Sequence, residues 1–359
     1  MNSTTIKLFA DHVITNGDNS NLDLFSGVAG NCIFFYELSR ALNNDFYQTT
    51  ADRLLDKLFE SKSILNLNTS FGNGLAGIGW CLEYLLKQGF CEGNRDEILE
   101  DIDNIIFRAI YESKKMPIDL SNGLLGYLIY IISRLEYSDH NDSFMLNAEL
   151  LKILINKIDN RIAASFHTLM RDTKFDLFGI FPILFYSLKK ALELDIYKDK
   201  IINVIKGWML YMETILPGIH SNRLSLAISL SELNNIITLD GIQQQVCTLL
   251  YSIDYSKLEL ECDLNSYSIN SGWLGQMFVL KKASERFGKG YPRYKNIDLF
   301  RKKMIGKYKY EYINCITKKI KEKKIDKIET GLFNGLSGIA MLLLSCPECF
   351  MIEEYDEKI

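Results

Sequence analysis

Three aspartates stand shortly before glycines that open apolar stretches, and their carboxylates could transfer protons there. They are Asp23, Asp119 and Asp176. A carboxylate at an opening can act as a general acid or base, and two of them across a cavity are what a glycosidase uses. The positive end of a helix dipole also favours a carboxylate at the start of a helix without any chemistry. Asp23 repeats the place of Asp119 in an earlier copy, which favours this second role, but both remain open.

A second set of candidates follows later in the chain. His220 lies two residues before Asn222, and Asn270 directly precedes Ser271. The histidine could carry a proton at the same opening. The amides and the hydroxyl of Asn222, Asn270 and Ser271 predict a metal-free pocket that hydrogen-bonds a peptide backbone. Ser271 also suits the N-cap of a helix, and Trp273 is expected to line the floor of the cavity.

The cysteines do not predict a metal site. Cys346 and Cys349 form a C-x-x-C pair, but a zinc site takes four ligands and no further ligands accompany the pair. Cys346 follows Gly335 by eleven residues, which is about 16 Å along a helix, and so belongs to the far end of it. We expect this pair to be structural and all eight cysteines to be reduced.

The glycines belong to a motif that recurs seven times. The clear copies are SGVAG at 26–30, NGLAG at 73–77, NGLLG at 122–126, SGWLG at 271–275 and NGLSG at 334–338. Two weaker copies are FGIFP at 178–182 and RLSLA at 223–227. Neighbouring copies lie 45 to 63 residues apart, a period typical of one supersecondary unit per repeat.

Each copy predicts the start of a buried helix. A Ser or Asn before the first glycine suits the N-cap, and two glycines three residues apart allow backbones to approach closely. Between the copies, amphipathic patterns predict a second set of helices. Their approximate ranges are 1–14, 46–61, 94–109, 143–165, 194–216, 241–253 and 297–319.

The alternation of the two kinds of helix predicts an all-α fold. We expect an α/α toroid of seven helical hairpins, with an inner and an outer layer. An open solenoid would need polar terminal repeats, whereas here the first and last inner helices are as apolar as the others, which favours a closed ring. The prediction is a single domain over residues 1–350, followed by a short acidic tail at 351–359.

Composition narrows the classes of function. The net charge of −4 argues against a nucleic-acid binder. No apolar run reaches the roughly 20 residues that cross a bilayer, and the N-terminus lacks the pattern of a signal peptide, so we expect a cytoplasmic protein without a membrane span. A lysine-rich segment at 318–327 is interpreted as a solvated helix surface, with a dock for an acidic peptide as the alternative.

The sevenfold G-x-x-G repeat resembles the lanthionine synthetase C-like (LanC-like) family over about residues 10 to 345. The resemblance implies a toroid that adds a cysteine thiol of a peptide to a dehydrated residue. In that family two cysteines and a histidine hold a zinc ion, which lowers the pKa of the thiol. A further histidine and an aspartate assist the reaction.

Carried over position by position, the resemblance retains only the aspartate, as Asp119. Asn222 stands at the cysteine position of the fifth repeat, and Phe178 stands at the histidine position of the fourth. The Cys-His pair of the sixth repeat is replaced by Asn270 and Ser271. Amides and a hydroxyl do not supply the thiolates and imidazole of a zinc site, so we expect no bound zinc and no other cofactor.

The resemblance implies a protein of a lanthipeptide-type modification pathway, with a precursor peptide as its partner and a dehydratase or another modification enzyme beside it. Two versions remain open. A zinc-independent cyclase would move protons with Asp119 and His220, whereas a catalytically silent protein would only bind the precursor. The expected peptide contacts are Asn222, Asn270, Ser271, Trp273, Asp176, Phe178 and Asp23. The alternative is a carbohydrate-active α/α toroid that uses the rim aspartates.

Overall fold

The computed structural model describes residues 3–17, 21–61, 64–112, 115–136, 142–169, 176–212, 216–322, 330–346 and 349. Within these ranges the chain forms helices α1 to α15, one 3-10 turn at Ile64–Asn66 and no β-sheet. The acidic tail expected at 351–359 lies outside the described residues. None of the described helices is long and apolar enough to cross a bilayer.

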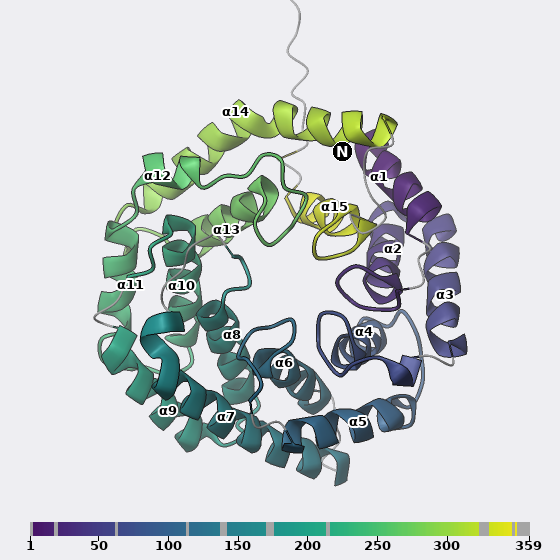
Figure 1. Ribbon diagram of the computed structural model, residues 1–359. Helices are drawn as coiled ribbons and strands as arrows, with labels where there is room; N and C mark the ends of the chain where they lie inside the picture. The colour runs from purple at the N-terminus through teal and green to yellow at the C-terminus, as the bar shows by residue number, and fades with distance from the viewer. Residues whose placement is uncertain are drawn as a thin grey trace, which may run out of the picture.

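Two concentric layers of helices form a closed ring (Figure 1). The inner layer consists of α2 (Val28–Leu42), α4 (Leu75–Lys87), α6 (Leu124–Leu135), α8 (Ile180–Glu193), α10 (His220–Leu233), α13 (Trp273–Arg286) and α15 (Leu336–Ser345). The outer layer consists of α1 (Ser3–Asn16), α3 (Asp45–Glu60), α5 (Arg95–Glu112), α7 (Asp142–Leu169), α9 (Lys198–Met212), α11 (Ile242–Tyr251), the short α12 (Tyr255–Leu260) and α14 (Tyr294–Lys321). Apart from α11 and α12, which follow one another in the outer layer, outer and inner helices alternate along the chain, which confirms the predicted toroid of seven hairpins.

The outer helices begin close to their predicted positions where a cap is present. Asn44 caps α3, and its side chain accepts a hydrogen bond from the backbone N–H of Phe46 at 3.0 Å. The start of α9 falls later than the expected residue 194. Asp195 and Tyr197 there adopt left-handed φ angles of 57° and 49°, which a helix cannot contain, so α9 begins only at Lys198.

The ring closes where α15 packs against α1 and α2. At this seam the backbone N–H of Phe333 donates to the carbonyl oxygen of Phe25 at 2.9 Å, and the two phenyl rings stack with centroids 3.9 Å apart. Deeper in the seam, the hydroxyl of Ser337 donates to the side-chain oxygen of Asn31 at 2.7 Å. Apolar packing and hydrogen bonds therefore join the first and last repeats.

The starts of the inner helices differ from the prediction in their caps. The first glycine of each clear copy is itself the N-cap, and no side chain caps these helices. The free N–H groups are bonded instead by carbonyl oxygens of the preceding loop. For example, Leu75 donates to Asn68 at 2.9 Å and Leu124 donates to Pro117 at 2.9 Å. The prediction that Ser271 caps its helix is therefore wrong, because a curled loop satisfies these donors.

The second glycine of each clear copy is required by the same loop. A Cβ atom on Gly77 would collide with the carbonyl oxygen of Phe71, six residues earlier, and every clear copy has this contact. In four of the five clear copies, all but that of Gly275, a side chain of the neighbouring repeat also lies against this glycine, as Leu24 lies against Gly77. At the seam, Leu332 of the last repeat lies on Gly30 of the first in the same way. The closing interface thus repeats the contacts found within the ring.

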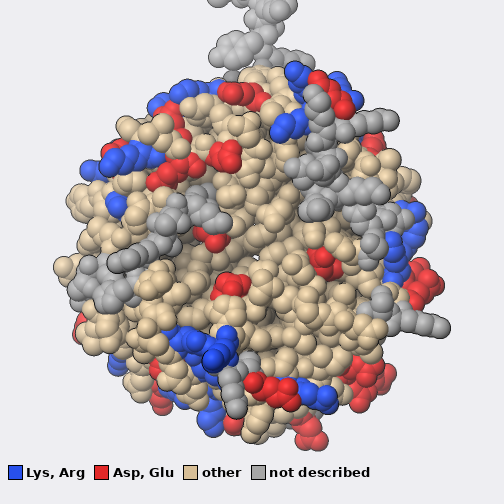
Figure 2. Space-filling model, viewed as in Figure 1, with Lys and Arg blue, Asp and Glu red and all other residues tan. Residues whose placement is uncertain are grey.

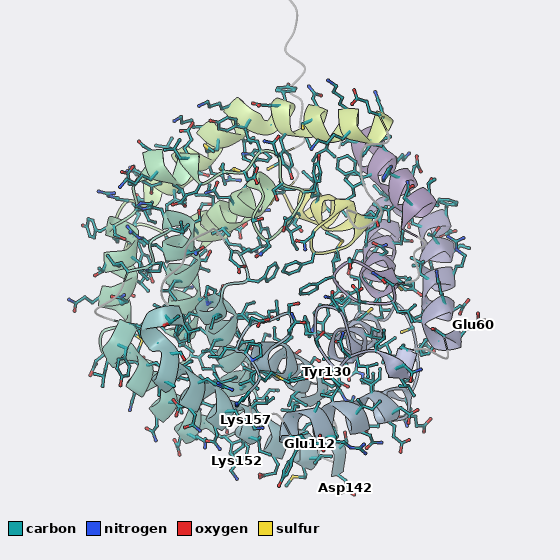
Figure 3. All side chains as sticks on the ribbon, viewed as in Figure 1. Glu60, Glu112, Tyr130, Asp142, Lys152 and Lys157 are labelled. Atoms are coloured by element: carbon teal, nitrogen blue, oxygen red, sulfur yellow. The ribbon has the colours of Figure 1, made fainter. Side chains whose placement is uncertain are left out.

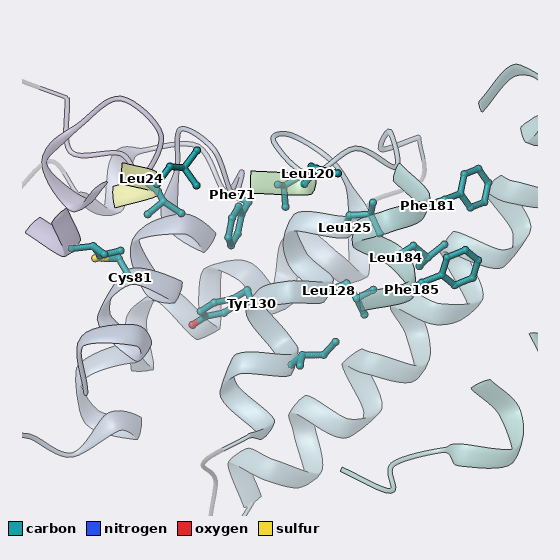
Figure 4. Packing of buried hydrophobic residues seen from close by; sticks show 14 of the residues in the cluster. Leu24, Phe71, Cys81, Leu120, Leu125, Leu128, Tyr130, Phe181, Leu184 and Phe185 are labelled. Carbon is teal, nitrogen blue, oxygen red and sulfur yellow. The ribbon is translucent and has the colours of Figure 1, made fainter. Parts of the chain in front are cut away.

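Apolar side chains fill the space between and within the layers (Figure 3). In Figure 4, Leu24, Phe71 and Leu120 lie above the starts of the inner helices, while Leu128 and Leu184 lie deeper between them. This core supports the glycine loops at one end of the ring.

One charged cluster is buried between the layers. Arg134 of α6 is 3% exposed and contacts Glu83 of α4 at 2.5 Å and Asp103 of α5 at 2.9 Å. Tyr130, labelled in Figure 3, donates its hydroxyl to Asp103 at 2.5 Å. Burial raises the pKa of both carboxyl groups, while Arg134 opposes the rise. The cluster ties three helices together through charge-assisted hydrogen bonds.

Candidate functional site

The glycine loops meet at one end of the ring and surround what we call the mouth. Backbone hydrogen bonds link neighbouring loops: Ile269 donates to Phe333, and Phe25 donates to Gly72, which in turn donates to Ser121. Figure 2 shows this face hollowed at its centre, with uncharged residues lining the hollow and a few carboxylates around it. The mouth is therefore built from loops that hold one another in place.

Four phenylalanines from four loops form an aromatic strip across the mouth. The strip consists of Phe71, Phe25, Phe333 and Phe178. Phe25 meets Phe71 edge-on at 6.3 Å, and Phe333 contacts Phe178 at 4.7 Å between centroids. Phe71 is buried, but the other three rings are partly exposed. Of these four residues, the sequence predicted only Phe178 as part of the site. The strip joins residues of distant repeats, so no local sequence pattern predicts it.

Two amides clamp the loop that leads into α8. The side-chain oxygen of Asn222 accepts from the backbone N–H of Asp176 at 3.3 Å. The side-chain oxygen of Asn270 accepts from the N–H of Phe178 at 3.3 Å, and its backbone carbonyl accepts from Leu177 at 2.9 Å. We call Asn222 and Asn270 the amide clamp. The structure thus brings together four of the residues predicted to lie at the mouth.

A cavity of about 120 Å³ lies beside the amide clamp. Its lining includes Asp176, Gly179, Phe181 and Asn222, together with Leu226 of α10. The space is large enough for a small side chain or a few water molecules. Asn222 and Asp176 give it one polar wall, whereas the remaining walls are largely apolar.

The residues at the clamp do not fit a zinc ion. Zinc in proteins is held by thiolates, imidazoles and carboxylates, while the side-chain oxygens of Asn222 and Asn270 already accept backbone N–H groups. Phe178 offers no ligand atom, and the hydroxyl of Ser271 lies 3.4 Å from that of Ser266. In the part of the chain that the structure describes, no group of three His, Cys, Asp or Glu residues could hold a metal.

The three rim aspartates each form a turn in their own loop. Asp119 accepts from the backbone N–H of Asn122 at 2.8 Å, and Asp23 accepts from that of Ser26 at 2.7 Å. Asp176 accepts from the N–H of Phe178 at 3.0 Å. A carboxylate that bonds a nearby N–H stabilises the loop itself. This geometry favours the structural role for all three and adds no observation in favour of a glycosidase pair.

Contrary to the prediction, His220 does not face the mouth. It is the first residue of α10, which starts four residues before Leu224, the expected motif position. The ring nitrogen Nδ1 accepts from the backbone N–H of Asp254 at 3.1 Å, on the side of the outer layer. Burial and the neighbouring Arg223 lower the pKa of His220. The histidine is therefore a buried neutral acceptor, not a proton carrier at the rim.

Glu261 explains the early start of α10 and was missed in the sequence. Its carboxylate accepts from the backbone N–H groups of His220 at 2.7 Å and Ser221 at 2.8 Å, so it caps the helix from another loop. Leu224 replaces the glycine in this repeat, so the usual curled loop cannot form. The missing glycine was the signal that another cap would be needed.

Contrary to the prediction, Trp273 does not line the floor of the cavity. Its side chain is 0% exposed and packs against Tyr312 of α14 with ring centroids 5.0 Å apart. The side chain therefore lies between the two layers, on the side of α13 that faces the outer helix α14. Its role is packing.

Comparison with known proteins finds a similar sequence family and a similar fold. Residues 18–177 match the family model described as lanthionine synthetase C-like protein. Among solved structures, nisin cyclase matches with a TM-score of 0.64 and 14% sequence identity, over 96% of this chain and 93% of that chain. No curated protein sequence matches the chain. Residues 18–177 are therefore similar to the LanC-like family, and the whole chain shares the fold of nisin cyclase.

Proposed function

We propose that this protein binds a precursor peptide of a lanthipeptide-type pathway at the mouth and does not activate its thiols with zinc. The observation that carries the proposal is the amide clamp. At the positions where the family has metal ligands, Asn222 and Asn270 hold the backbone of the loop at 176–178. These side chains stabilise the backbone of a loop, and they are not ligands of a metal that would activate a thiol. The protein acts in the cytoplasm, where a dehydratase supplies the modified precursor.

The mouth offers contacts that suit an extended peptide. The partly exposed rings of Phe25, Phe333 and Phe178 can cover apolar side chains of the peptide. Rim groups such as Asp119 and Ser271 lie within the same ring of loops and can bond peptide N–H groups. A dehydrated precursor is rich in apolar, unsaturated residues, so an aromatic strip beside polar loops matches its chemistry. Holding the chain in place is the function that these contacts support best.

Binding and ring closure can be separated in one experiment. The purified protein is incubated with a dehydrated, cysteine-bearing precursor, and free thiols are counted by alkylation and mass spectrometry. Ring closure leaves the mass unchanged but removes thiols. We expect saturable binding with thiol loss no faster than in buffer. Phe333→Ala should weaken binding about tenfold, because it removes one aromatic anchor, whereas Phe46→Ala, on exposed surface of α3, should not.

Two outcomes would contradict the proposal. Thiol loss that depends on the protein and falls in Asp119→Asn would show a zinc-independent cyclase instead. Absence of binding to any dehydrated precursor, with an intact fold, would remove the peptide function altogether.

Restoring the family ligands tests the assignment of the clamp positions. We expect Asn222→Cys, Asn270→Cys and Ser271→His together to create a site that binds about one zinc per chain, because two thiolates and an imidazole are a sufficient protein ligand set. The readout is metal content after dialysis, compared with the unchanged protein. If the triple variant folds but takes up no zinc, these three positions do not converge as the metal ligands of the family do.

A further inference from the structure

The outer helix α14 carries a charge that sets it apart from the rest of the protein. It contains nine Lys or Arg residues and only two acidic ones, a net charge of +7. Because the whole chain carries −4, the remainder carries −11. In Figure 2, Lys and Arg side chains project along this edge of the ring, among some carboxylates. The positive charge is thus concentrated on one helix of an acidic protein.

The lysines of α14 face outward. The exposed ones are Lys295, Lys302, Lys303, Lys307, Lys318 and Lys321, which we call the α14 face. Carboxylates contact four of these six lysines. Glu259 of α12 contacts both Lys303 and Lys307 at 2.7 Å, Asp298 contacts Lys302 at 2.8 Å, and Glu322 lies 4.0 Å from Lys318. Lys323, Lys324 and Lys327 continue the pattern in the sequence but lie outside the described residues.

Apolar side chains are exposed on and beside the α14 face. Leu299 and Tyr310 of α14 are 64% and 47% exposed, and Leu260 of the adjoining α12 is 85% exposed. Exposed aliphatic and aromatic groups among lysines are suited to a partner that presents carboxylates and apolar side chains together. The helix has 28 residues and is about 42 Å long, enough for an extended contact.

We propose that the α14 face binds an acidic polypeptide segment that carries apolar side chains between its carboxylates. This goes beyond the binding of a precursor at the mouth, since the face lies on the outer layer. A nucleic acid fits less well, because the exposed side chains of Leu299 and Leu260 have no role on a phosphate backbone. A membrane surface fits less well too, because the apolar stripe of α14, which includes Phe300 and Ile316, is buried against the core.

A peptide titration tests the proposal on the full chain. The probe is a fluorescein-labelled peptide of about 20 residues in which Leu recurs every three or four positions and Glu occupies positions between the leucines. We expect saturable binding that weakens as salt rises, because the attraction is between exposed charges. Lys318→Glu with Lys321→Glu should weaken binding about tenfold, since two attractions become repulsions. The matched control, Lys198→Glu with Lys206→Glu on α9, changes the net charge equally and should have little effect.

Four results would overturn the proposal. Equal weakening in both double variants would show that only net charge matters. Equally tight binding of oligothymidylate would identify a general polyanion site, and binding of the protein to vesicles with anionic lipids but not to the peptide would identify a membrane surface. Peptide binding that appears only after removal of residues 351–359 would make the chain's own acidic tail the occupant. Since no precursor is used, failure here leaves the function of the mouth untouched.

Discussion

Replacing Arg134 by Met is expected to lower the free energy of unfolding by about 3–5 kcal/mol. The guanidinium group is 3% exposed and bonds both Glu83 and Asp103, so its loss removes the buried cation that the two carboxylates share and leaves Glu83 with only the more distant Arg95, at 3.7 Å. Urea denaturation followed by circular dichroism measures the change. Arg53→Met, at an exposed position of α3, is the control and should change the stability by less than about 0.5 kcal/mol.

The pH dependence of the same variant gives a second test. Burial already raises the pKa of Glu83 and Asp103. At pH values just above the ordinary pKa of a carboxyl group, the folded protein therefore binds more protons than the unfolded chain. This contribution to stability is present at low pH and is lost as the pH rises through the raised values. Without Arg134 both pKa values should rise further. The difference in free energy of unfolding between the unchanged protein and the variant should therefore become smaller from pH 7 to pH 5. A deficit that is independent of pH would show that packing, not charge, holds these helices together.

Replacing Gly77 by Ala is expected to destabilise the protein by about 3 kcal/mol. The new Cβ atom would collide with the carbonyl oxygen of Phe71 and press on Leu24 of the preceding repeat. Neither is the free end of a flexible chain, so the loop before α4 has to move. The midpoint of thermal unfolding measures the loss.

Gly207→Ala is the matched control for this variant. Gly207 lies inside α9, and a Cβ atom there meets nothing within 4 Å. The substitution should stabilise the protein by about 0.5–1 kcal/mol, because alanine has less backbone freedom to lose on folding. If both variants behaved alike, the curled loop would not be the reason for the glycines of the motif.

The amino-acid sequence predicted the architecture because that information is local and repeated. Apolar spacing predicted each helix, and the period of the glycine motif predicted the number of hairpins. Closure followed from the apolar character of the end helices, and the structure confirms it with Leu332 on Gly30. The sequence also indicated that Asn222, Asn270 and Phe178 belong to one place, and their hydrogen bonds bring them together.

The sequence left open the direction in which each side chain points. Whether His220 faces the mouth depends on the start of α10, which Glu261 sets from forty-one residues away. Whether Trp273 lines the cavity depends on its contact with Tyr312 of α14. Tertiary contacts decide these matters because a capping group or a packing partner can come from anywhere in the chain. The periodicity of the sequence therefore determined the ring, whereas tertiary contacts between the loops and helices decided which residues line its mouth.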